Sequence, residues 1–139
     1  MKIFCAYAFT GEDKPAVEAR MRRVCNALKA SGHDVYCNMF APDYEQLKGV
    51  RQIFAHAFAA LQAADVVIPV VASDRRSEGQ LIEIGAALVL GKPVYLLQHV
   101  SATEKSYIQD LATKTVVWHT EDELAAEAAR IAKDIARPA

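Results

Sequence analysis

The sequence predicts one α/β domain spanning residues 1–139. We expect a small doubly wound parallel sheet of about five strands with helices on both faces, as in flavodoxin-like and Rossmann-like folds. Two observations lead to this prediction. Short apolar runs alternate along the chain with longer segments of helical periodicity. The run VVIPVV at residues 66–71 is apolar throughout, as expected of a central strand that is buried on both faces.

Five apolar runs are short enough to be strands, at residues 2–9, 33–40, 64–71, 92–99 and 114–120. Helices are expected between and after them, at residues 15–32, 50–65, 78–91 and 122–136. The first helix begins with Pro15 and ends at Gly32, which are typical start and stop signals. In such sheets a ligand binds outside the carboxyl ends of the strands, where the strand order reverses. The site is therefore expected in the segments that follow Phe9, Cys37 and Val71.

The composition argues against several classes of protein. Lys and Arg number 16 against 17 Asp and Glu, so no basic surface for nucleic acid is expected. No stretch approaches the roughly 18 apolar residues of a membrane helix, and the N-terminus lacks the apolar region of a secretion signal. The three cysteines are widely spaced, which suits reduced thiols. We predict a cytoplasmic protein with no nucleic-acid or membrane partner.

The segment SDRRSEGQ, residues 73–80, follows the predicted central strand and leads into a helix. Ser77 and Gln80 have the spacing of a capping box, in which the two side chains satisfy free N–H groups at a helix start. A helix start also favours an anion such as phosphate, and Arg75 and Arg76 stand beside it. The segment is predicted both to cap the helix and to bind an anion.

Glu83 is a single carboxylate in a run that is otherwise nearly apolar from Leu81 to Leu90. One interpretation is that Gln80, Glu83 and Ala87 form a stripe that faces solvent. The other is that the small neighbours of Glu83 leave room for a ligand, with the carboxylate facing the crevice. The pattern alone favours the solvent stripe, because exposed glutamates greatly outnumber catalytic ones.

The segment ADVVIPVVASDRRSEGQLIEIGAALVLGKPVYLL resembles the signature of the nucleoside 2-deoxyribosyltransferase family. The matching positions are Ala64 and Asp65 before the strand, then Gly79, Glu83, Ile84 and Gly85 after it. The resemblance implies that Glu83 is a nucleophile that attacks the anomeric carbon of a nucleoside or nucleotide and releases the base. Because such a carboxylate must stay charged, we expect Glu83 to be partly solvated.

The resemblance is nearest to the branch that hydrolyses 2'-deoxynucleoside 5'-monophosphates. In that branch the residue six positions before the Glu is a serine that binds the 5'-phosphate, and here it is Ser77. The resemblance implies a homodimer or larger assembly, in which a serine of the neighbouring subunit completes the phosphate site. Ser106 is the candidate for that serine, and an ordinary loop or helix-cap role is an equal alternative.

Two positions depart from the family. Ala57 replaces an Asp that assists the leaving group, and the adjacent His56 is either a substitute acid or a structural residue. Tyr7 and Phe9 stand where the hydrolases have phosphate-binding residues, and they are expected either to stack on a base or to pack in the core.

Three other functions stay open: a deoxyribosyltransferase, an NAD hydrolase similar to Toll/interleukin-1 receptor domains, and a nucleotide sensor without activity. The four histidines lie in separate segments without metal-ligand spacing, and the chemistry calls for no metal or cofactor. On the basis of Glu83 and Ser77, the predicted function is that of a glycosidase that hydrolyses the base–sugar bond of a nucleoside or deoxynucleoside 5'-monophosphate.

Overall fold

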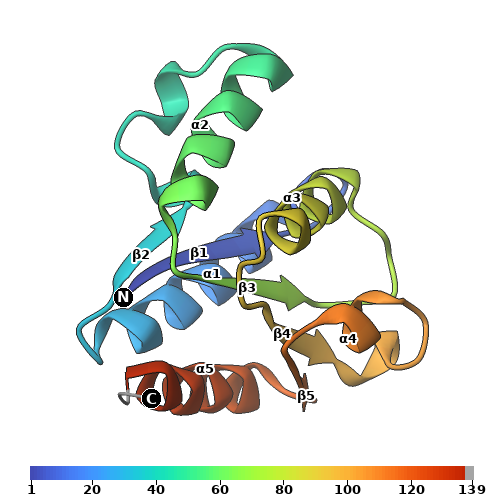
Figure 1. Ribbon diagram of the computed structural model, residues 1–139. Helices are drawn as coiled ribbons and strands as arrows, with labels where there is room; N and C mark the ends of the chain where they lie inside the picture. The colour runs from blue at the N-terminus through green and yellow to red at the C-terminus, as the bar shows by residue number, and fades with distance from the viewer. Residues whose placement is uncertain (137–139) are drawn as a thin grey trace.

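The computed structural model describes residues 1–136 (Figure 1). The strands are β1 Lys2–Tyr7, β2 Asp34–Cys37, β3 Val66–Val71, β4 Tyr95–His99 and β5 Lys114–Trp118. The helices are α1 Lys14–Lys29, α2 Gly49–Ala63, α3 Glu78–Val89, α4 Ile108–Leu111 and α5 Glu121–Ala136. All five expected strands and all four expected helices are therefore present.

The five strands are parallel and lie in the order β2-β1-β3-β4-β5, which confirms the predicted doubly wound sheet. β3 is the central strand, and Val67 and Ile68 in it are fully buried. The strand order reverses between β1 and β3, because the chain runs from β1 outward to β2 and then returns to β3. A crevice is expected at the carboxyl ends of these two strands.

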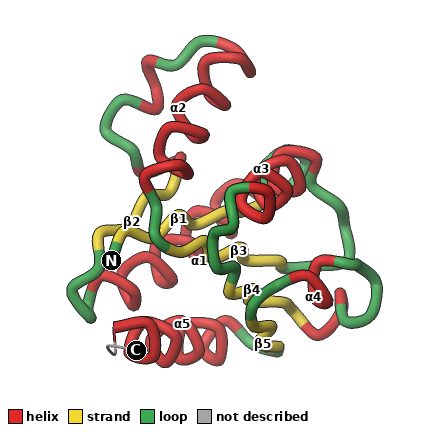
Figure 2. Tube along the Cα trace, in the orientation of Figure 1, coloured by secondary structure: helices red, strands yellow, loops and turns green. Residues whose placement is uncertain are grey.

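Helices cover both faces of the sheet, with α1 and α5 on one side and α2 and α3 on the other (Figures 1 and 2). Successive residues of β1 alternate between the two cores. Ile3 and Cys5 join the core under α1 and α5, whereas Phe4 joins the one under α2 and α3. α2 packs through Ala57 and Leu61, while its first residues, including Val50, extend into solvent. This overhang places the start of α2 beside the carboxyl edge of the sheet.

The structure corrects the prediction at the end of β2 and in the loops. The expected strand 33–40 ends at Cys37, because Asn38–Phe40 turns as a short 3₁₀ helix. Further short helices that the sequence did not predict are Tyr44–Gln46, Val100–Ala102 and α4. These segments are too short to show a hydrophobic period.

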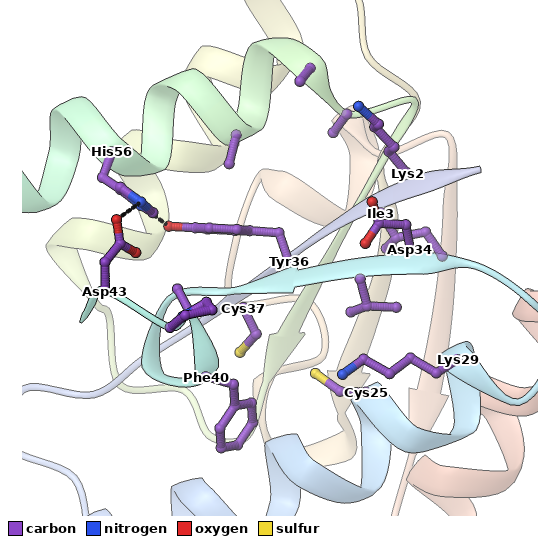
Figure 3. Close-up of a pocket in the computed structure, with 16 residues that line it drawn as sticks. Lys2, Ile3, Cys25, Lys29, Asp34, Tyr36, Cys37, Phe40, Asp43 and His56 are labelled. Atoms are coloured by element: carbon purple, nitrogen blue, oxygen red, sulfur yellow. Dashed lines mark hydrogen bonds and ion pairs between the residues drawn. The ribbon is translucent and has the colours of Figure 1, made fainter. Parts of the chain in front are cut away.

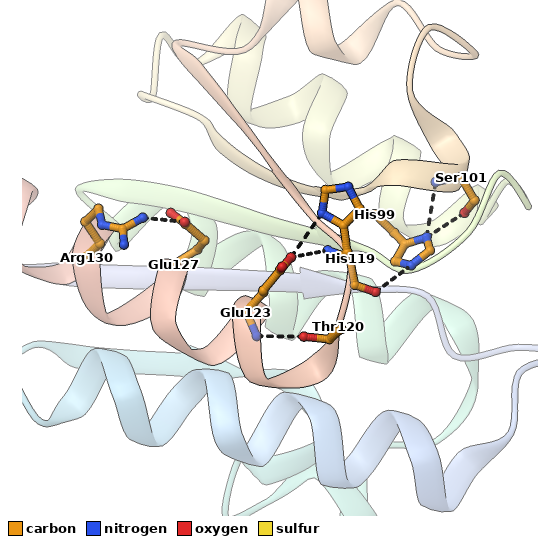
Figure 4. Close-up of polar contacts among 7 residues, drawn as sticks. All are labelled: His99, Ser101, His119, Thr120, Glu123, Glu127 and Arg130. Carbon is orange, nitrogen blue, oxygen red and sulfur yellow. Dashed lines mark hydrogen bonds and ion pairs between the residues drawn. The ribbon is translucent and has the colours of Figure 1, made fainter.

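α5 begins at a complete side-chain cap (Figure 4). The Thr120 hydroxyl accepts the backbone N–H of Glu123 at 3.1 Å, and the Glu123 carboxylate accepts the backbone N–H of His119 at 2.7 Å. Hydrogen bonds from His119 to this carboxylate lower the pKa of Glu123. The carboxylate of Glu123 therefore occupies the start of α5.

Cys5, Cys25 and Cys37 are free and buried in the core under α1 and α5. Within residues 1–136, no helix is long and apolar enough to cross a membrane.

Candidate active site

A cleft of about 450 Å³ opens where the strand order reverses. Four segments line it: the end of β1, the turns after β2, the start of α2, and the β3–α3 loop with the first turns of α3. The expected site residues in its wall are Tyr7, Phe9, Arg75, Arg76, Ser77, Gly79 and Glu83. The structure thus brings seven of the nine expected residues together at one place.

Glu83 lies in the second turn of α3 and is 6% exposed. Gln80 and Ala87 are also buried, so the interpretation of these three residues as a solvent stripe is wrong. The exposed face of α3 carries apolar residues instead, among them Ile82 and Val89. The amphipathic pattern of α3 is inverted, because its polar side chains point toward the cleft.

Burial raises the pKa of Glu83 to about 7. Neither a cation nor a hydrogen-bond donor among residues 1–136 offsets this effect. The expectation that Glu83 is partly solvated is therefore wrong for most of its surface. With a pKa of about 7, the Glu83 carboxyl group can be either protonated or ionised near neutral pH, as a catalytic carboxylate in a cleft requires.

Ser77 caps α3, since its hydroxyl accepts the backbone N–H of Gln80 at 3.3 Å. The reciprocal half of the predicted capping box does not form. The Gln80 amide donates instead to the carbonyl oxygens of Val70 at 2.8 Å and Ala6 at 3.3 Å. Gln80 thus joins the ends of β1 and β3 where the strands diverge, and the start of α3 stays open to the cleft.

Arg75 and Arg76 form a cationic edge of the cleft. The Arg75 guanidinium donates to the Gly11 carbonyl in the loop after β1, and a Cβ at Gly11 would overlap that guanidinium. The Arg76 guanidinium donates to the Lys105 carbonyl at 3.4 Å. Both charges are held near the start of α3 by backbone carbonyls that leave them uncompensated.

Aromatic rings form another part of the wall. Tyr7 and Phe9 meet edge to face, with 6.2 Å between ring centroids, and both pack on the core while lining the cleft. The two interpretations of these rings, base stacking and core packing, are therefore compatible. Phe54 of α2 also lines the cleft, at 3.6 Å from where a Cβ on Gly79 would lie.

His56 lies outside the cleft, in a second cavity of about 410 Å³ along the edge strand β2 (Figure 3). Its ring contacts the Tyr36 hydroxyl at 2.7 Å and the Asp43 carboxylate at 3.0 Å. Ala57 lies on the buried face of α2 and does not line the cleft. Being an alanine, it supplies no acid. His56 lines this second cavity and not the cleft that holds Glu83.

Ser106 also lies outside the cleft of its own chain. It lines a small neighbouring cavity with Arg76 and Ser77, and its hydroxyl accepts the backbone N–H of Ile108 at 3.2 Å. That hydrogen bond fits the loop or helix-cap alternative, and it leaves the hydroxyl proton free.

Eight residues that line the cleft were not among the expected site residues: Thr10, Asn38, Tyr44, Val50, Ile53, Phe54, Glu78 and Gln80. Asn38 directly follows Cys37, in one of the segments where the site was expected. Its position in the sequence could therefore have identified it. Phe54 was assigned to the apolar stripe of α2, and Gln80 to the capping box. No group of three or more His, Cys, Asp or Glu within residues 1–136 could hold a metal ion.

The fold is shared with solved structures of low sequence identity. The CMP N-glycosidase BcmB of Clostridium botulinum superposes with a TM-score of 0.71 at 20% identity, over 94% of this chain and 99% of that chain. The solution structure of BlsM superposes with a TM-score of 0.72 at 18% identity, over 99% of this chain and 95% of that chain. A 2-deoxyribosyltransferase of Bacillus psychrosaccharolyticus gives 0.66 at 21% identity, over 90% of both chains.

No curated protein matches this chain in sequence. The sequence model of one family, described as nucleoside 2-deoxyribosyltransferase, matches residues 4–130, which includes every element that lines the cleft. The chain therefore belongs to the nucleoside 2-deoxyribosyltransferase family and is an enzyme that acts on N-glycosidic bonds.

Proposed function

We propose that this enzyme hydrolyses the base–sugar bond of a nucleoside or deoxynucleoside 5'-monophosphate, with Glu83 as the nucleophile. The observation that carries the proposal is the buried carboxylate of Glu83, which has no partner among residues 1–136 and lines the same cleft as aromatic rings and two arginines. Aromatic rings suit a base, and the cationic edge suits a phosphate. Glu83 then stands beside the sugar that joins them.

The reaction follows the logic of a retaining glycosidase. A Glu83 oxygen bonds to the anomeric carbon while the C–N bond breaks, and the electron pair of that bond leaves with the base. Water then attacks the same carbon and displaces Glu83. One water proton stays on the new sugar hydroxyl and the other completes the free base. The products are the base and a sugar 5-phosphate.

The start of α3 supplies the phosphate site in this proposal. The Ser77 hydroxyl accepts from Gln80, so its own proton remains available for a phosphate oxygen. The open helix start and the guanidinium groups of Arg75 and Arg76 add positive potential at the same edge. An aspartate at position 77 would repel the phosphate, whereas a serine binds it.

We propose that the enzyme works in the cytoplasm as a homodimer or larger assembly, with the partner covering the exposed apolar face of α3 and the nearby α4. Val89 is 89% exposed and Tyr107 of the α4 cap is 83% exposed. Leu81 and Ser106 line one small cavity between these elements, so a partner seated here would bring its own Ser106 near the Arg76 edge.

Light scattering tests the assembly. The parent should have at least twice the mass of one chain, and Val89→Glu should dissociate it because a charge would be buried at the interface. A parent that is a monomer at assay concentration would contradict the assembly and remove Ser106 from the site.

Liquid chromatography of a panel of nucleotides and nucleosides, including NAD, tests the function. Release of a base from monophosphates only, with a sugar 5-phosphate as co-product, is the expected result. Base exchange among nucleosides would assign the transferase activity, because a second base then replaces water. Nicotinamide release would assign NAD hydrolysis, and saturable binding without any product would assign a sensor.

A further inference from the structure

We propose that Asn38 hydrogen-bonds the base of the substrate, and that a chain of polar side chains running from Asp43 through His56 and Tyr36 holds its amide in place. This inference rests on the proposed function, because it assigns the contact at the leaving base. Asn38 lines the cleft, whereas the other three residues line the second cavity behind it (Figure 3).

Each link of this chain is short. The His56 ring nitrogen Nε2 contacts Asp43 Oδ2 at 3.0 Å, and Nδ1 contacts the Tyr36 hydroxyl at 2.7 Å. The Tyr36 hydroxyl donates to Asn38 Oδ1 at 2.5 Å. The chain draws on β2, α2 and both turns after β2, so it fixes Asn38 against three separate segments.

The environment of Tyr36 keeps it a donor. Its ring stacks on Phe4, with 5.3 Å between centroids. Burial raises the pKa of Tyr36, and the nearby carboxylates of Glu83 and Asp43 raise it further. The hydroxyl therefore stays protonated. Its one proton goes to Asn38 Oδ1, which requires that His56 Nδ1 donates to the Tyr36 oxygen.

The direction of that bond decides what Asn38 offers to the cleft. An asparagine amide has one oxygen and one NH₂ group. Because the oxygen accepts from Tyr36, the NH₂ group is the end that remains for a ligand. Asn38 is thus set to donate to an acceptor on the base.

Such a donor stabilises the leaving base. When the C–N bond breaks, its electron pair spreads to an acceptor atom two bonds from the glycosidic nitrogen. This atom is O2 in a pyrimidine and N3 in a purine. A fixed donor at that atom is worth more in the transition state than in the bound substrate. This contact provides the assistance that the buried Ala57 does not supply.

The test uses Asn38→Ala, which removes the donor, and Tyr36→Phe, which removes the bond that orients it without changing the cleft wall. The controls are Asn26→Ala on the exposed side of α1 and Tyr95→Phe on β4, neither of which lines the cleft. Melting curves confirm that each variant is folded. The substrates are cytidine, deoxycytidine and adenosine monophosphates, and the 5-fluorocytosine analogue, whose base is a better leaving group.

We expect kcat to fall about tenfold or more in Asn38→Ala and about threefold in Tyr36→Phe, with the controls unchanged. Both losses should shrink on the fluorinated substrate, because its base needs less stabilisation. If Asn38 and Tyr36 had only a structural role, each variant would lower kcat by the same factor on the fluorinated and the unfluorinated substrate. The pyrimidine and adenine arms show which acceptor atom is used.

Calorimetry with ribose 5-phosphate, which has no base, completes the test. Its affinity should not change in Asn38→Ala, whereas the affinity for the nucleotide should fall. Unchanged kcat and unchanged nucleotide affinity in Asn38→Ala would overturn the inference, while base release by the parent would still support the proposed function. If the parent releases no base, the function fails, and the two affinities alone decide whether Asn38 contacts the base.

Discussion

The starts of α3 and α5 carry the same sequence pattern but have different chemistry. Each begins with a hydroxyl residue, Ser77 or Thr120, followed three residues later by Gln80 or Glu123. In α5 the later side chain turns back and closes the helix start with a carboxylate (Figure 4). In α3 it turns inward and joins β1 to β3. The difference shows that the same capping pattern can close a helix start, as in α5, or leave it open at the cleft, as in α3.

The two helices also place their carboxylates in opposite environments. Glu123 is exposed, and hydrogen bonds from His119 lower its pKa. Glu83 is buried without a partner, which raises its pKa to about 7. Solvated carboxylates at helix starts stabilise the fold, whereas a buried one without a partner costs stability and needs another reason to be there.

The largest expected effect is on turnover by Glu83→Gln. Glutamine keeps the size of the side chain but cannot form the covalent intermediate, so kcat should fall by about a thousandfold or more while nucleotide affinity largely survives. Glu18→Gln, on an exposed part of α1, is the matched control and should keep full activity. Full activity of Glu83→Gln on the substrate identified by the panel would end the catalytic role of Glu83.

The second effect is on stability, and its sign follows from the raised pKa. The fold favours the protonated form of Glu83, so stability is lost as pH rises through about 7. At pH 8, Glu83→Gln should therefore be more stable than the parent by roughly 1 to 3 kcal/mol, and at pH 4 the two should be equal. Over the same range kcat/KM of the parent should rise. Urea unfolding at both pH values measures the difference, and equal stability at pH 8 would contradict the burial of an unpaired carboxylate.

The smallest effect separates the two helix starts. Ser77→Ala and Thr120→Ala each remove a cap and should each cost about 1 kcal/mol of unfolding free energy. Only Ser77→Ala should also raise the KM for a monophosphate, by about tenfold, because in the proposed function its hydroxyl donates to the phosphate. Steady-state kinetics on both variants checks this, and equal KM values would remove Ser77 from the phosphate site.

Much of the fold could be predicted because its signals are local. The apolar run at 64–71 and the helix predicted to begin at Pro15 match β3 and α1 to within three residues at either end. The strand order also gave the place of the cleft. The predicted end of β2 was wrong. The Asn38 side chain is held by Tyr36, whose hydroxyl also contacts His56 of α2, and no local sequence pattern records such a contact.

The candidate site could be predicted only in part. Ser77 and Glu83 stand at fixed offsets from β3, and a resemblance found them. Whether Gln80 and Glu83 face the solvent or the cleft depends on how α3 is turned on the sheet, because a helix with apolar residues on both sides fits either way. The roles of Asn38 and Tyr36 depend on contacts across the edge strand β2, which the sequence does not show.

The most direct test of the central claim is to trap the intermediate on Glu83. A nucleoside monophosphate with fluorine at the 2' position of the sugar slows the hydrolysis of the glycosyl-enzyme, so mass spectrometry of a digest can locate the sugar. The account predicts that the peptide containing Glu83 gains the mass of the fluorinated sugar 5-phosphate, and that Glu83→Gln gains none. An adduct on another residue, or base release from this substrate with no adduct, would contradict it.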